Sequence, residues 1–188
     1  MALEDNSTAY IHNGSFVNNR CNLPNHNPTA AGGGIHVGNS TLRVTNSRFE
    51  NNQAGYVGGG IYAIGTWTDP VTTPRSDVLV VNSTFVGNQA LRDASVSLTF
   101  PTEAGALHAE DQTSARIVNS RFFFNSANTG GGVNAYRAIV DISDSHFEGN
   151  RATGFGGANG FGGAISMISN DANDASTAGG RSTAVRCR

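Results

Sequence analysis

ARIVNSRFFFNSANTGGGVNA, residues 115–135, is one copy of a pattern that occurs five times in this 188-residue chain. Each copy begins with alternating apolar and polar residues. It continues with a Phe that has an Asn three residues later, and it ends with a Gly-rich step into an aliphatic residue. The Phe/Asn pairs are Phe16/Asn19, Phe49/Asn52, Phe85/Asn88, Phe122/Asn125 and Phe147/Asn150. The aliphatic residues are Ile35, Ile61, Leu107, Val133 and Ile165. Such a period predicts a repeat architecture, in which most recurring residues serve the fold.

The residues before each Phe alternate with a period of two. In the second copy Leu42, Val44, Ser47 and Phe49 belong to one face, and mostly polar residues lie between them. This alternation predicts a half-buried strand that ends near the Phe. A second strand is expected to start at each Gly step. No segment shows a sustained apolar stripe of helical period, so we expect little or no α-helix.

The shortest copy spans about 25 residues, and longer copies carry insertions at 20–31, 65–76, 91–104 and 153–161. One such unit cannot bury its own apolar face, but stacked units form a continuous core. We therefore predict an all-β fold, a parallel β-helix (solenoid) of about five to six coils. It forms a single domain over residues 1–188, with repeats at about 9–168 and a polar tail or irregular cap at 169–188.

Asn and Gly recur at fixed places in the pattern. One Asn column consists of Asn13, Asn46, Asn82 and Asn119, with Asp144 in the last copy; the other runs from Asn19 to Asn150. Stacked amides can bond along a column, and Asn tolerates the left-handed backbone of tight turns. The Gly runs at 32–34, 58–60 and 130–132 are interpreted as corners that need an unusual φ. These columns are predicted to be structural.

Two short motifs carry a family resemblance. Gly162–Ile165 reads GGAI, and FxxN occurs at Phe49–Asn52, Phe85–Asn88, Phe122–Asn125 and Phe147–Asn150. This pairing resembles the repeats of chlamydial polymorphic outer membrane proteins and is similar to the β-helix repeats of the pectate-lyase-like superfamily. The resemblance covers roughly residues 9–168 and implies right-handed winding. It implies no single activity, because such folds host adhesins, passenger domains, lyases, hydrolases and epimerases.

Charge and cysteine content narrow the range of partners. The net charge is -2, and all 12 basic residues are scattered arginines. This pattern gives no reason to expect nucleic acid or an anionic membrane as partner. No apolar run approaches the roughly 18 residues of a membrane span, and the first residues do not resemble a signal peptide. We expect an extracellular or cell-surface location, with Met1 beginning a mature or trimmed form. Whether Cys21 and Cys187 pair stays open at this point.

The best candidate for a binding site is the column that follows the Gly-step aliphatic residues and faces away from the core. It consists of His36, Tyr62, His108, Asn134 and Ser166. Around the third copy, Glu110 and Tyr136 join it, and two insertions with Trp67, Asp69, Asp93 and Glu103 could flank it. Flat aromatics beside acids suit a sugar. The expected ligand-binding residues are Tyr62, Trp67, His108 and Tyr136, and the candidate catalytic residues are His108, Glu110, Glu103 and Asp93.

The same residues limit the chemistry. No three or four acids recur on adjacent copies, so no metal site or cofactor is predicted, and calcium at Glu110 and Asp111 is the alternative. Paired acids of a glycosidase need about 5–10 Å between them, which Glu110 and Glu103 or Asp93 reach only if the insertion folds favourably. The leading hypothesis is a non-catalytic secreted or cell-surface module with a structural, adhesive or glycan-recognition role. The alternative is a polysaccharide-active enzyme that uses the face around His108 and Glu110. Expected partners are a polysaccharide or cell-surface glycan, and further copies of the chain through open solenoid ends.

Overall fold

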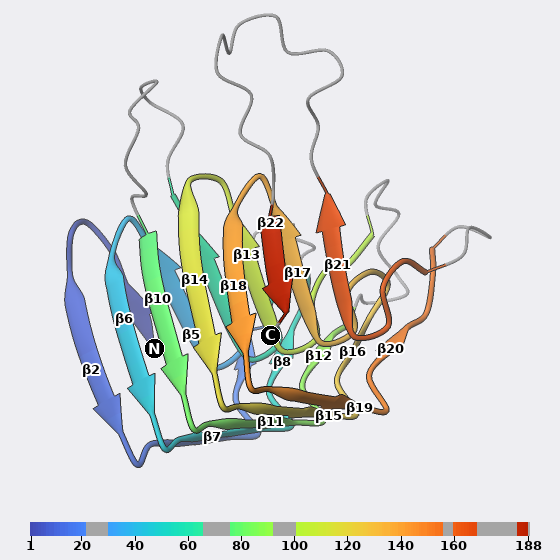
Figure 1. Ribbon diagram of the computed structural model, residues 1–188, viewed down its shortest axis with the longest axis horizontal. Coiled ribbons are helices and arrows are strands. Elements are labelled where there is room, and N and C mark those ends of the chain that lie inside the picture. The colour runs from blue at the N-terminus through green and yellow to red at the C-terminus, as the bar shows by residue number, and fades with distance from the viewer. Residues whose placement is uncertain (22–29, 66–75, 92–100, 156–159, 169–183, 188) are drawn as a thin grey trace, which may run out of the picture.

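The computed structural model describes residues 1–21, 30–65, 76–91, 101–155, 160–168 and 184–187. Within these ranges all named elements are β-strands, and all strand pairs are parallel. The strands stack coil upon coil, from the N-terminal coil at one end of Figure 1 to β21 and β22 at the other. The predicted parallel β-helix of five to six coils is thus confirmed.

Four parallel sheets run along the solenoid. Sheet A contains β1 (Ala2–Leu3), β5 (Ile35–Gly38), β9 (Ile61–Ile64), β13 (Leu107–Glu110), β17 (Val133–Tyr136) and β21 (Ile165–Ile168). Sheet B contains β2 (Thr8–His12), β6 (Thr41–Thr45), β10 (Ser76–Val81), β14 (Thr113–Val118), β18 (Ile139–Ser143) and β22 (Ala184–Cys187).

The two remaining sheets have shorter strands. Sheet C contains β3 (Ser15–Val17), β7 (Arg48–Glu50), β11 (Thr84–Val86), β15 (Arg121–Phe123) and β19 (His146–Glu148). Sheet D contains β4 (Arg20–Cys21), β8 (Gln53–Ala54), β12 (Gln89–Ala90), β16 (Ser126–Ala127) and β20 (Arg151–Ala152).

The repeated Phe residues form a continuous column in the core. They are direct register partners on neighbouring strands of sheet C. Their rings stack with centroids 4.5–4.8 Å apart and planes within 5° of parallel. This distance equals the spacing of hydrogen-bonded strands, so each ring takes the place that the backbone sets for it. Phe49, Phe85 and Phe122 are fully buried.

The second Asn column forms a ladder of buried amides. Asn52 Nδ2 donates to Asn88 Oδ1 at 2.9 Å and to Phe16 O at 2.8 Å, and Asn52 N donates to the same Oδ1 at 3.0 Å. Asn88 repeats this arrangement toward Asn125 and Phe49. Because a buried polar group is costly unless it is hydrogen-bonded, the repeated Asn is required by the fold, as predicted.

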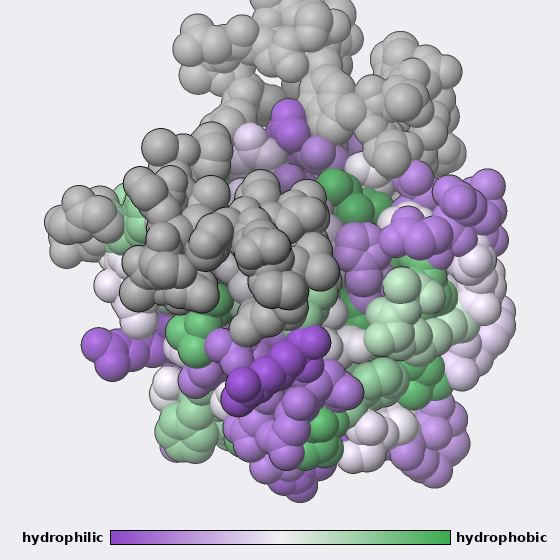
Figure 2. Space-filling view, turned by 180° about the vertical axis from the view of Figure 1, so that it is seen from behind, coloured by the Kyte–Doolittle hydropathy of each residue, from purple (hydrophilic) through white to green (hydrophobic). Residues whose placement is uncertain are grey.

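The predicted corners are also present. Every member of the first Asn column has a φ between 46° and 53°, including Asp144 at 51°. Gly32, Gly58, Gly130 and Gly162 have φ values of 60–71°. The sequence patterns of Asn and Gly therefore locate the left-handed turns. On the side opposite to Figure 1, hydrophilic and apolar residues are interspersed over the coloured surface (Figure 2).

The C-terminal tail contains a strand that the sequence did not predict, and the positions of the two cysteines answer whether they pair. Residues 169–188 were expected to be a polar tail or irregular cap, yet β22 within them pairs with β18 and extends sheet B. Its four residues, Ala184–Cys187, are too short a segment to identify as a strand from the sequence. Cys21 is a free thiol in the first coil, whereas Cys187 lies in β22 of the last coil. Since a disulfide needs Cα atoms within about 7 Å, the two cysteines do not pair within one chain.

Candidate functional site at the third coil

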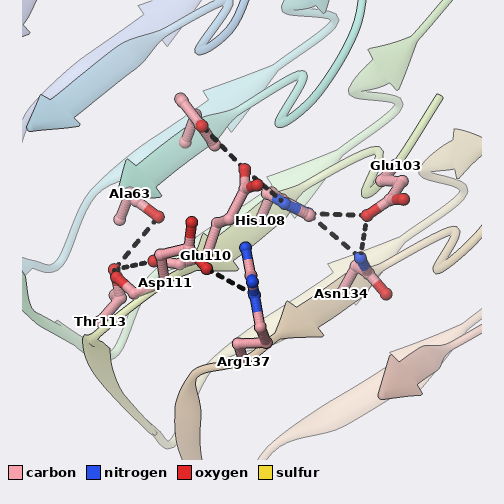
Figure 3. Close-up of polar contacts among 9 residues, drawn as sticks. Ala63, Glu103, His108, Glu110, Asp111, Thr113, Asn134 and Arg137 are labelled. Atoms are coloured by element: carbon pink, nitrogen blue, oxygen red, sulfur yellow. Dashed lines mark hydrogen bonds and ion pairs between the residues drawn. The ribbon is translucent and has the colours of Figure 1, made fainter. Parts of the chain in front are cut away.

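The candidate site lies on the side of sheet A that faces away from the core. In β13, Leu107 and Ala109 belong to the core, so the alternation of the strand directs His108 and Glu110 to the other side. Tyr62 and Asn134 flank His108 as its register partners on β9 and β17. Three neighbouring coils thus place their side chains in one row, of which Figure 3 labels His108 and Asn134.

This row is buried, and that corrects the expectation of an open outward column. Tyr62 is 8%, His108 1%, Asn134 0% and Ser166 6% exposed, whereas the His36 side chain keeps 28%. The physical reason is a second apolar cluster outside sheet A, in which Val57 and Ala31 pack with Tyr62. Val57 also bridges to Glu103, and Glu103 to Thr129, so the segments before the Gly steps form their own layer.

His108 lies between two carboxylates. Its Nδ1 is 3.7 Å from Glu103 Oε2, and its Nε2 is 3.4 Å from Glu110 Oε2. Asn134 Nδ2 donates to Glu103 Oε2 at 2.5 Å and lies 3.2 Å from His108 Nδ1. Nδ1 thus faces Asn134 and Glu103, and Nε2 faces Glu110. Both ring nitrogens are therefore occupied (Figure 3).

Tyr62 completes the contacts of Glu110. Its hydroxyl donates to Glu110 Oε2 at 2.8 Å, and its ring stacks on His108 with centroids 5.6 Å apart. Burial, followed by the Glu110 carboxylate, strongly raises the pKa of Tyr62, so the phenol stays protonated and serves as a donor.

The two carboxylates differ in their protonation. Burial is the largest influence on Glu103 and raises its pKa, against the opposing charge of His108. Burial also acts to raise the pKa of Glu110, but interactions with His108 and Tyr62 and the charge of Arg137 outweigh it, so the pKa of Glu110 is lowered. On the two sides of one imidazole, the pKa of Glu103 is thus raised and the pKa of Glu110 is lowered.

Strained corners surround the site. Ala104 has a φ of 53°, Gln112 48° and Arg137 49°. The equivalent of Ala104 in the other coils is a Gly with positive φ, such as Gly58 or Gly130. Left-handed backbone is unfavourable for residues with a Cβ. These conformations are held by contacts on either side, among them the ion pair of Arg137 Nε with Asp111 Oδ1 at 2.7 Å.

The structure brings together most of the residues that the sequence suggested. His108, Glu110, Glu103 and Tyr62 form one contact network. Tyr136 is the register partner of Glu110, and the Arg137 guanidinium lies 4.6 Å from the centre of its ring. Trp67, Asp69 and Asp93 lie outside the described residues.

Sequence reasoning gave Asn134 no chemical role, although it linked the residue to the same column as His108. Asn134 connects Glu103 to His108, and its Oδ1 is buried without a hydrogen-bond partner among the described residues. The signal was its position one coil after His108 in the row. Among the described residues, no three His, Cys, Asp or Glu side chains are grouped as metal ligands.

The fold and the repeated contacts define a parallel β-helix repeat protein. Residues 46–64 match the model of the Chlamydia polymorphic membrane protein repeat. The match includes the FxxN residues Phe49 and Asn52 and the Gly step into Ile61, so the chain resembles these repeats as the sequence suggested. It indicates a module of a surface or outer-membrane protein.

No curated protein and no solved structure matches the chain. The part of the chain that the structure describes contains no helix with the length and apolarity needed to cross a membrane.

Proposed function

We propose that the protein is a non-catalytic surface module, in which a rigid β-helix presents its outer faces for adhesion or glycan recognition. The observation that carries this proposal is the placement of His108. Its imidazole is 1% exposed and lies between Glu103 and Glu110. In a glycosidase the scissile bond or its attacking water lies between the two carboxyl groups. Here a side chain of the protein fills that space.

The cluster has a structural role in this proposal. Polar groups buried outside sheet A need partners, and His108, Asn134 and Tyr62 supply them to the two carboxylates. This joins the layer that contains Glu103 to sheet A across coils two to four. The cluster thereby fixes the outer layer from which the surface of the module is built.

A polysaccharide-active enzyme is the second candidate, favoured by the opposite pKa shifts of Glu103 and Glu110. A pair of carboxyl groups with divergent pKa values is typical of an acid and base pair. Ala104, next to Glu103, has a strained backbone, and such strain is common at active sites. The burial of the histidine between the acids favours the non-catalytic alternative.

Turnover separates the two candidates. Purified protein is incubated with a panel of acidic and neutral polysaccharides, and new reducing ends and unsaturated products are measured. We expect no turnover above that of the Glu110→Gln variant. Turnover that disappears in Glu110→Gln and Glu103→Gln, while both variants keep the wild-type circular dichroism spectrum, contradicts the proposal and supports the enzyme.

Self-association through the solenoid ends is part of the same proposal. The amide ladder has a direction, since each Asn donates to the Oδ1 of the next coil. The first coil therefore presents Asn19 Oδ1 as an acceptor, and the fifth coil presents the backbone N–H of Asn150 as a donor. Phe16 and Phe147 are only partly buried at these ends. Size-exclusion chromatography over a concentration series tests this, and a monomer at every concentration contradicts it.

A further inference from the structure

Phe124 adopts a backbone conformation that its residue type disfavours. Its φ is 54°, at a corner between β15 and β16. The equivalent corner residues are Asn18, Asn51, Gly87 and Gly149, which are the residue types that tolerate a left-handed backbone. A Phe at this corner costs free energy that an Asn or a Gly does not, so the fold itself gives no reason for a Phe.

The next coil provides a seat for the Phe124 ring. A Cβ on Gly149 would lie 2.4 Å from Phe124 Cδ1 and 2.5 Å from Cε1, so the ring rests where any other residue would place its side chain. The Phe124 backbone N–H also donates to Glu148 O at 3.0 Å. The ring therefore lies over the backbone of Gly149 in the next coil, and the Phe124 backbone is paired to that same coil.

Despite this seat, the Phe124 side chain is 61% exposed. The Phe123 ring lies 6.4 Å from it and 5.7 Å from the His146 ring, measured between centroids. His146 Nε2 and Glu148 Oε2 form an exposed pair at 3.3 Å, each side chain being 63% exposed. Phe123 thus links the exposed Phe124 ring to His146, and His146 and Glu148 offer a donor and an acceptor that are both accessible to solvent.

We propose that the Phe124 ring is a stacking platform for a neutral hexopyranose unit of a glycan. One face of such a sugar carries C–H groups, which pack on the negative face of an aromatic ring. Its hydroxyl groups can then donate to Glu148 and accept from His146. A ring that is already fixed loses little conformational entropy on binding, which compensates for the cost of its strained backbone. This inference rests on the recognition role proposed above and assigns it to a site.

The test compares two exposed aromatic residues. Binding of the wild type to immobilised lactose and cellobiose conjugates is measured by surface plasmon resonance, with sialyllactose and heparin as anionic comparators. Phe124→Asn introduces the residue that coils one and two already carry, so the fold is retained. We expect binding to lactose or cellobiose to weaken about tenfold in this variant. Glu148→Gln is expected to weaken it less.

Tyr10→Ser is the matched control, because Tyr10 is 80% exposed on sheet B, and this variant should bind as the wild type does. The inference is overturned if the wild type binds neither neutral conjugate, if Phe124→Asn binds equally well, or if the anionic comparators bind more tightly. None of these binding results measures turnover. The proposed non-catalytic function is therefore tested separately, by the polysaccharide assay.

Discussion

Replacing Asn88 by Ala tests how much the amide ladder stabilises the solenoid. The Asn88 side chain is fully buried and takes part in four hydrogen bonds. Its Oδ1 accepts from the backbone N–H and the Nδ2 of Asn52, and its Nδ2 donates to Phe49 O and Asn125 Oδ1. The Ala variant leaves these four partner groups to be satisfied in a closed core.

Some of the four partner groups keep another hydrogen bond in the variant and some do not, and this difference sets the expected loss of stability. Asn52 Nδ2 keeps its bond to Phe16 O, and Asn125 Oδ1 keeps the Asn88 backbone N–H. The backbone N–H of Asn52 has no alternative acceptor among the described residues. One buried orphan costs about 1–3 kcal/mol, and the lost packing adds to it, so we expect the free energy of unfolding to fall by about 3–4 kcal/mol.

Asn19→Ala is the matched control at the exposed first coil. Asn19 donates to Asn52 Oδ1 but receives no bond from a preceding coil, and its loss should cost less than about 1 kcal/mol. Urea denaturation followed by circular dichroism gives both values from the midpoint at unchanged slope. Equal losses for the two variants would refute the argument that burial makes the ladder costly to break.

Other substitutions test the third-coil site and the core. Ala104→Gly should raise the free energy of unfolding by about 1 kcal/mol in thermal denaturation, because Gly adopts the φ of 53° freely, and destabilisation would show that no strain is stored there. Glu110→Gln should destabilise the protein near neutral pH. The lowered pKa of Glu110 gives stability that is present above its ordinary value of 4.5 and is lost as the pH falls through the folded-state pKa, so the variant's deficit should shrink in acid. Glu103→Gln should stabilise the protein near neutral pH, since the raised pKa of Glu103 gives stability that is present below 4.5 and is lost as the pH rises. Changes in the urea midpoint that have the same sign for both variants would contradict the assignment. Phe85→Ala, which interrupts the ring column, should cost about 3–5 kcal/mol, and a loss under 1 kcal/mol would show that the stack collapses around it.

The coil could be predicted from the sequence because its determinants are local and repeated. A Phe and an Asn equivalent to Phe122 and Asn125 recur in every copy. The period of two then assigns each strand side chain to a face. The left-handed corners followed from Asn and Gly. Phe124 and Ala104 break that rule, and no residue pattern could show that their φ would stay positive.

The candidate site was predictable only in part, for a related reason. Alternation shows that His108 faces away from the core, but it does not show what covers that face. The contact with Glu103 depends on a bridged layer outside sheet A and on the corner at Ala104. The pairing of Asn134 with Glu103 depends on the same layer. Non-local contacts between insertions and the repeat carry no period, so composition and spacing cannot locate them.

The amide ladder also has a consequence for how such a chain can change its length. Successive ladder partners are 33, 36, 37 and 25 residues apart in the sequence, yet the stacked rings keep a nearly constant spacing of 4.5–4.8 Å. Each turn is anchored at its Phe and Asn, and the residues between anchors do not set the rise. Mutations that lengthen or shorten one turn therefore need not disturb its neighbours. The architecture permits rapid divergence of inserted segments on a constant frame, and it offers positions where foreign peptides can be grafted.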